Sequence, residues 1–110
     1  MSAQSDETPV LDLITNFNAS AIEASSLELD EQMLVRIAVL VAVDAPPASY
    51  MMNLGAAGEV GVSAERVQGV LCAIAPIVGT ARVVSAAGKM VRALGLALDL
   101  AELEAAAGED

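Results

Sequence analysis

Residues 61–82 read GVSAERVQGVLCAIAPIVGTAR and contain the start, the apolar stripe and the end of one complete helix. The glycine at position 61 is a natural end for a preceding helix, and Ser63 is a favoured cap for the next one. Pro76 is expected to bend this helix or to end it early. Gly79-Thr80 then repeats the pattern of a stop followed by a cap. The apolar stripe, at helical spacing, consists of Val67, Val70, Leu71, Ile74, Ile77 and Val78.

On the N-terminal side, three further helices are expected, each opened by a capping residue or a proline. The first is amphipathic, the second is apolar on almost every side, and the third ends before the glycine at position 61. The apolar part of the second helix, Met33 to Val43, contains one charged residue, Arg36. Its guanidinium needs a partner, and the candidates are Asp44 and Glu65. The expected starts of the three helices are Thr8-Pro9, Asp30, and Pro47 or Ala48.

On the C-terminal side, the pattern predicts two more helices. The first begins at Thr80 and ends at Gly95, and its apolar stripe includes Met90 and Leu94. A last helix is expected from Leu96 to about residue 106. Because no segment shows sustained strand alternation, the sequence predicts an all-α fold, an antiparallel bundle of about six helices.

The composition bounds the size, the surface and the location of the protein. At 110 residues we expect one domain over 1–110, with loose ends at 1–7 and 107–110. The chain is 55% hydrophobic with a mean hydropathy of +0.60, so much apolar surface stays exposed and a homo-oligomer is expected. The net charge of −10 argues against nucleic acid as a partner. The longest apolar stretch, Val67–Ala81, is too short to span a membrane, and the N-terminus does not resemble a signal peptide, so the expected location is cytoplasmic.

The residue types that carry much of enzyme chemistry are nearly missing from this chain. It has no histidine to act as a general base near neutral pH, and its one cysteine cannot form an internal disulfide. A zinc site built from histidine and cysteine is excluded for the same reason. We therefore predict no catalytic residue, no metal and no cofactor. The cysteine, Cys72, falls on the small-residue side of its helix and is expected to be a buried, inert thiol.

Several segments between Leu29 and Leu96 match one known family. They are LVRIA at 34–38, GVSAERV at 61–67 and APIVGTAR at 75–82. In combination they resemble the carboxymuconolactone decarboxylase and alkylhydroperoxidase D-like family, with a family core at about 29–96. The resemblance implies an all-helical, antiparallel bundle that assembles as trimers or hexamers.

The redox members of that family carry a Cys-x-x-Cys-x-x-x-His motif at the start of the third helix. By the resemblance, the two cysteines correspond to Pro46 and Ser49, and the histidine corresponds to Asn53. None of these residues can form a disulfide or move protons near pH 7. The chain therefore resembles a divergent member without the redox centre.

Two groups of polar residues are candidates for a binding site. Ser49, Tyr50 and Asn53 lie within one turn of a helix and offer hydroxyl and amide groups to a polar ligand. The alternative is that Ser49 lines a helix start and Tyr50 packs with its hydroxyl at a rim.

The second group is a basic stripe on the fifth helix, formed by Arg82, Ser85, Lys89 and Arg92. One interpretation is a site for an anionic carboxylate, with Arg82 nearest the helix start, where anions are favoured. The alternative is a solvated face, or ion pairs with acidic residues of a neighbouring subunit.

The sequence thus favours a non-redox, homo-oligomeric binding or assembly protein, a trimer or hexamer. A small organic acid is the expected partner besides the protein itself, in a pocket lined by Ser49, Tyr50, Asn53 and Arg82. The alternative is a decarboxylase or isomerase acting on a small carboxylate lactone, in which Arg82 holds the anion and Tyr50 or an acidic side chain handles the proton. An alkylhydroperoxidase ranks third, because the motif it needs is missing.

Overall fold

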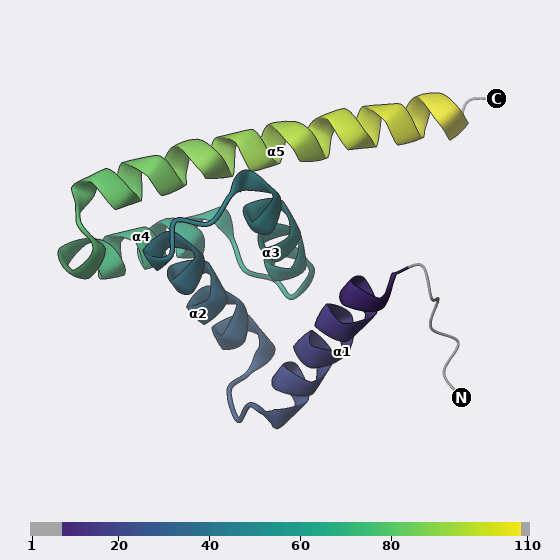
Figure 1. Ribbon diagram of the computed structural model, residues 1–110. Coiled ribbons are helices and arrows are strands. Elements are labelled where there is room, and N and C mark those ends of the chain that lie inside the picture. The colour runs from purple at the N-terminus through teal and green to yellow at the C-terminus, as the bar shows by residue number, and fades with distance from the viewer. Residues whose placement is uncertain (1–7, 109–110) are drawn as a thin grey trace.

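The computed structural model describes the backbone of residues 8–108 and the side chains of residues 8–95, with four more at 102, 103, 105 and 106. Within the described residues the chain forms five α-helices and no strand, which confirms the all-α prediction (Figure 1). Of the expected loose ends, residues 1–7 and 109–110 lie outside the described residues, and residues 107–108 belong to the last helix. The helices are α1 (Pro9–Ala24), α2 (Leu29–Ala42), α3 (Pro47–Glu59), α4 (Ala64–Val78) and α5 (Thr80–Gly108).

The helix starts follow the expected capping chemistry at Ser63 and differ at α2. The Ser63 hydroxyl accepts a hydrogen bond from the backbone N–H of Arg66 at 3.2 Å, as expected for a cap. At α2 the cap is Glu28, which forms a reciprocal capping box with Glu31, so the prediction of Asp30 as the cap is wrong. Asp30 already lies in the first turn, where its carboxylate forms an ion pair of 3.1 Å with Arg66 of α4.

The helix ends differ from expectation at two places. Pro76 does not end α4, which continues to Val78 and stops at Gly79, where φ is +90°. A proline this close to the end removes little of the helix's hydrogen bonding. Gly95 does not end α5, so a single helix of 29 residues replaces the predicted fifth and sixth helices. A glycine inside a helix costs about 1 kcal/mol, and the alanine- and leucine-rich segment that follows favours continuation.

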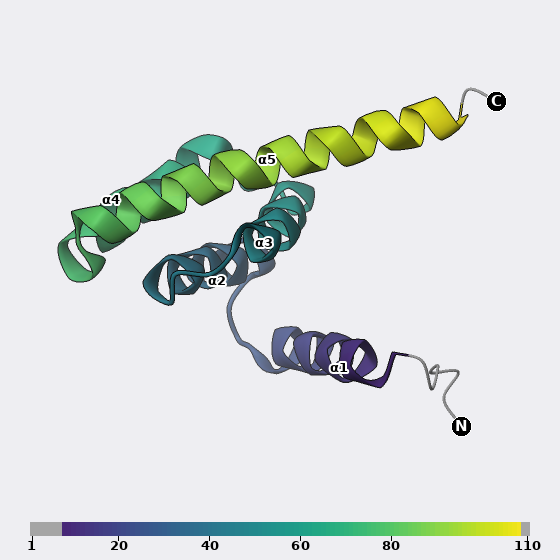
Figure 2. The same ribbon diagram turned by 45° about the horizontal axis from the view of Figure 1, so that its top comes forward.

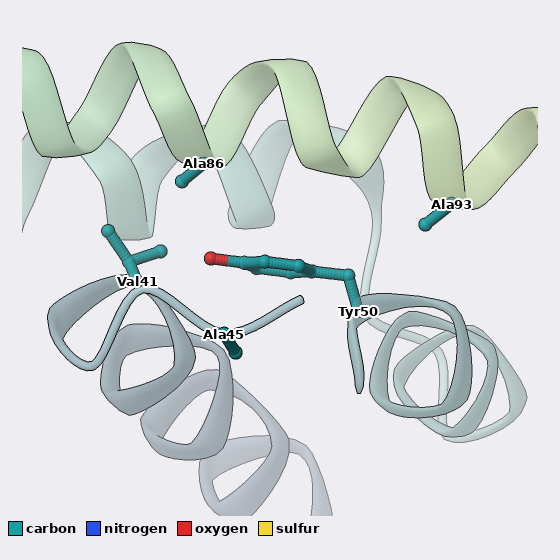
Figure 3. Packing of buried hydrophobic residues seen from close by; sticks show 5 residues of the cluster. All are labelled: Val41, Ala45, Tyr50, Ala86 and Ala93. Carbon is teal, nitrogen blue, oxygen red and sulfur yellow. The ribbon is translucent and has the colours of Figure 1, made fainter. Parts of the chain in front are cut away.

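Helices α2 to α5 form the packed body of the protein, with α5 lying across the others (Figures 1 and 2). One buried cluster joins the end of α2 to α3 and α5, where alanines on α5 let it approach Tyr50 closely (Figure 3). A second joins α2 and α3 to the turn before α4. The first consists of Val41, Ala45, Tyr50, Ala86 and Ala93, and the second of Met33, Ile37, Ala57 and Val62.

Helix α1 stands apart from this body in both views of the molecule (Figures 1 and 2). None of its residues is buried, and it takes part in none of the close helix pairings of the body. One attachment is the buried side-chain amide of Gln32, whose Nε2 donates to the carbonyl oxygens of Ile22 in α1 at 3.4 Å and of Leu27 in the connection at 2.9 Å. Helix α1 is therefore a tethered arm beside the body.

Many large apolar side chains of the described residues are exposed in the single chain. Most of them lie on α1, on the outer side of α2 and on α5, with Met52 on α3 and Ile77 on α4 in addition. No helix in the described part of the chain has the length and apolarity needed to cross a membrane.

Candidate binding cleft

A cleft of about 440 Å³ opens between α1 and the body, against α2 and α3. Its wall is largely apolar, and four polar side chains converge on it from three different helices. The polar residues are Thr15 and Asn18 of α1, Arg36 of α2 and Asn53 of α3, and the apolar residues are Ile14, Ile22, Met33, Met52 and Ala56. Concave sites of this size and character are where proteins hold small molecules.

Arg36 supplies the positive charge of the cleft. Its Nη1 donates a hydrogen bond to Oδ1 of Asn18, which joins the body to α1. The predicted partners Asp44 and Glu65 are wrong, because Arg36 lies on the side of α2 turned to α1, while Asp44 follows the end of α2 and pairs with Lys89. Among the described residues Arg36 forms no ion pair, and a guanidinium has five N–H donors, so most of its capacity is open to a ligand.

Asn53 lines the same cleft from α3 and is held in place by its own helix. Its Nδ2 donates to the backbone carbonyl oxygen of Ser49 at 2.8 Å, one turn earlier. The bond leaves the second N–H and the carbonyl oxygen of the Asn53 amide for another partner. Ser49 is half-buried and is not among the residues that line the cleft. Of the predicted pair, Asn53 therefore faces the cleft and Ser49 orients it through its backbone.

Tyr50 points the other way, into the first buried cluster. Its side chain is fully buried, and its hydroxyl, directed toward Val41 and Ala86, has no hydrogen-bond partner (Figure 3). Burial raises the pKa of the phenol above its ordinary value of 10.0, the charge of Asp44 raises it further, and Arg82 opposes them. The hydroxyl thus lies in the core and not at a rim. A ligand in the cleft does not reach it.

The basic stripe on α5 binds the end of α2. Nη1 of Arg82 donates to the Ala42 carbonyl at 2.6 Å, and Nζ of Lys89 donates to the Asp44 carboxylate at 2.8 Å. The Ser85 hydroxyl donates to the same carboxylate at 3.2 Å. Asp44 itself has a left-handed φ of 56°, as expected just past a helix end.

The bond from Arg82 satisfies a carbonyl group that a helix leaves open at its C-terminus, and Arg82 and Lys89 both lie where the helix dipole favours cations. The hydrogen bond from Lys89, followed by that from Ser85, holds the pKa of Asp44 below its ordinary value of 3.8. Three members of the stripe therefore stabilise the contact between α5 and the C-terminal end of α2, and none of them lines the cleft. Arg92, the fourth, is exposed.

Cys72 is an exposed free thiol, so the prediction of a buried cysteine is wrong. Helix α4 packs on α2 and α5 with its larger apolar residues, which turns the small-residue side outward. The thiol lies outside the set of residues that line the cleft. Within the described residues there is also no group of His, Cys, Asp and Glu side chains arranged to hold a metal ion.

The four predicted binding residues are thus not gathered in one pocket. Asn53 reaches the cleft, while Tyr50 and Arg82 serve the packing of α2, α3 and α5. The cation that does accompany Asn53 is Arg36. The sequence signal for it was a single charge in the apolar segment 33–43, which indicates a partner outside that segment.

Comparison with known proteins identifies a family. The model of the carboxymuconolactone decarboxylase family matches residues 8–92, a range that includes α1 as well as most of the segment that carries the resemblance. The comparisons with curated proteins and with solved structures give no significant match.

Proposed function

The chain belongs to the carboxymuconolactone decarboxylase family, and on this scaffold we propose a non-redox, homo-oligomeric protein that binds a small organic acid in the cleft beneath α1. The observation that carries the proposal is the Arg36 guanidinium, set in a largely apolar cleft without a carboxylate partner among the described residues. An exposed ligand carboxylate is the group that best matches the planar fork of an arginine.

Recognition would divide between the two kinds of lining residue. Arg36 binds the carboxylate, and the amides of Asn18 and Asn53 orient it from opposite sides of the cleft. The body of the acid packs on the methionines and isoleucines of the wall. This division of a few polar groups in an apolar cleft gives orientation as well as affinity.

Binding without redox turnover fits the residues at the positions that matter in the family. Pro46 is the cap of α3, and Ser49 and Asn53 follow in its first two turns, so no thiol pair stands there. Alkylhydroperoxidase activity would need a pair of cysteines at positions 46 and 49, and this chain has Pro46 and Ser49 there. The decarboxylase or isomerase alternative uses Arg82 for the anion and Tyr50 or an acidic side chain for the proton. Arg82 binds the Ala42 carbonyl, and Tyr50 is buried away from the cleft with a raised pKa.

Self-association is the second part of the proposal, and a trimer or hexamer is the expected assembly. It is supported by the exposed large apolar side chains of α1, α2 and α5 among the described residues. Burial of such faces between copies is the usual way in which a soluble protein accommodates them.

The binding proposal is tested by thermal unfolding with pairs of carboxylates and neutral analogues, such as benzoate and benzamide. We expect the acid to raise the Tm of the wild-type protein and the amide not to do so. Arg36→Gln should weaken acid binding by about ten- to a hundredfold, since a hydrogen bond to a charged group contributes about 1.5–3 kcal/mol.

Arg66→Gln is the matched control, because it removes the same charge from an arginine that is paired with Asp30 outside the cleft. It should retain the Tm increase. Equal loss in both variants would mean that the acid responds only to net charge, and no Tm increase across the panel would remove the support for a carboxylate site.

A further inference from the structure

Helix α1 carries a second apolar face, separate from the one that lines the cleft. The cleft is lined from α1 by Ile14, Thr15, Asn18 and Ile22. The outer stripe is formed by Val10, Leu13 and Phe17. A spacing of three and four residues places them together on a different side of the helix. Phe17 is 75% exposed, the most of the three. In a single chain nothing covers this outer stripe.

A groove of about 330 Å³ runs between α4 and α5 on the body of the protein. Its lining is apolar except for one glutamine, and its α5 edge includes two exposed residues, Val91 and Leu94. The lining residues are Leu54, Ala64, Val67, Gln68, Leu71, Met90, Val91 and Leu94. Unlike the cleft, the groove has no charged lining residue, so it suits an apolar ridge better than a small acid.

We propose that the outer stripe of α1 docks in the α4–α5 groove of a second copy of this chain. Helix α1 projects from the body as a separate arm (Figures 1 and 2), and the α4–α5 groove is a concave surface that can receive a helix face. The outer stripe and the lining of the groove are also both apolar. A single aromatic ring with two branched neighbours is the kind of anchor that fills an interface pocket.

The exposed charges of the two helices are opposite in sign. Helix α1 contains Asp12 and Glu23 and no basic residue. Of the three basic residues in 80–95 of α5, Arg82 and Lys89 bind the end of α2, and Arg92 is exposed next to Val91 at the edge of the groove. An acidic α1 and this exposed arginine therefore attract one another.

The stripe and the groove are different surfaces, so each copy gives one contact and receives one. A head-to-tail contact of this kind generates a ring when the rotation closes. Helix α1 also forms one wall of the cleft of its own chain. A copy that binds its neighbour's α1 in the groove therefore also fixes the wall of that neighbour's cleft. The inference rests on the proposed self-association, and it names the surfaces and the polarity of the contact.

The test uses two variants that break opposite halves of the contact. Phe17→Glu disables the stripe and leaves the groove, whereas Leu94→Glu disables the groove and leaves the stripe. We expect the wild-type protein to be an oligomer by native mass spectrometry and each variant alone to be a monomer with an unchanged helical circular dichroism spectrum. Mixed one to one, the two variants should form a heterodimer through the one intact stripe and the one intact groove.

Val39→Glu is the matched control, an exposed valine changed in the same way on the outer side of α2, and it should leave the oligomer intact. If Leu94→Glu fails to fold, Val91→Glu replaces it at the same groove edge.

A wild-type monomer would overturn both the self-association and the inference. An oligomer that survives Phe17→Glu, or two monomeric variants that do not pair when mixed, would overturn the inference alone and leave self-association in place through another surface.

Discussion

The α1 arm and the four-helix body use the same kind of sequence for different purposes. Both carry apolar residues at helical spacing, and both form helices. In the body the core-facing residues of α2 and α3 are buried, with Ile37 and Tyr50 at 0% exposure, whereas no residue of α1 is buried. Periodicity determines that a face is apolar, and the tertiary structure determines what covers it. The body therefore carries the stability of the fold, and the arm is left to meet a ligand and another copy.

The largest difference between the two regions should appear in amide hydrogen exchange. We expect the amides of α1 to exchange at least about a thousandfold faster than those of α2 and α3 in the Phe17→Glu variant. A 16-residue helix without buried side chains is marginal by itself, so it opens without unfolding the body. Exchange measured by NMR checks this, and equal protection in arm and body would contradict the division.

Matched isoleucine truncations in the two regions provide a direct energetic comparison. Ile37→Ala should lower the free energy of unfolding by about 2–5 kcal/mol, because it leaves a cavity in a fully buried site. Ile14→Ala, at a position that is 57% exposed, should lower it by less than about 1 kcal/mol. Urea unfolding of both variants measures the difference, and comparable losses would mean that α1 packs as tightly as the body.

Tyr50→Phe tests a buried polar atom inside the body. The Tyr50 hydroxyl has no partner, so removing it relieves an unpaired polar group and keeps the ring. We expect the variant to be as stable as the wild-type protein, or more stable by up to about 1 kcal/mol. A clear destabilisation in the same urea experiment would show that the hydroxyl has a partner after all.

The smallest effect is expected at the α2–α5 contact. The pKa of Asp44 is lowered by the hydrogen bonds from Lys89 and Ser85, so the ionised carboxylate stabilises the folded state. This stabilisation is present above the ordinary pKa of 3.8 and is lost as pH falls through the lowered folded-state pKa. Asp44→Asn should therefore lower Tm slightly at pH 7.

At a pH below the folded-state pKa of Asp44, the Tm values of the Asp44→Asn variant and the wild-type protein should converge. A Tm difference that stays constant across this pH range would assign the effect to packing and not to the charge. Lys89→Gln should show the same convergence, because it removes the other partner of the ion pair.

Local signals in the sequence were enough for the helical scaffold. The cap at Ser63, the stop at Gly79 and the proline start of α3 act through neighbouring residues, and all three were predicted. The prediction that Gly95 ends a helix is wrong. Helix α5 continues through it, because the cost of one glycine is small against a long segment of good helix formers.

The candidate site was less predictable, because it depends on contacts between segments that are distant in the sequence. Asn53 was expected from the resemblance, but Arg36 meets Asn18 across the connection between α1 and α2, and no local pattern specifies that contact. The exposure of Cys72 likewise depends on which side of α4 its neighbours cover. A buried tyrosine with an unpaired hydroxyl is equally invisible to periodicity.

The central claim is that a small organic acid binds beneath α1 through Arg36. The most direct measurement follows the side-chain amide NMR signals of the asparagines while benzoate is added. The account predicts shifts at Asn18 and Asn53, which line the cleft, and none at Asn16, which is exposed on α1 and outside the lining. Both shifts should vanish in Arg36→Gln. Unchanged signals at Asn18 and Asn53 with saturating benzoate, or shifts that persist without Arg36, would contradict it.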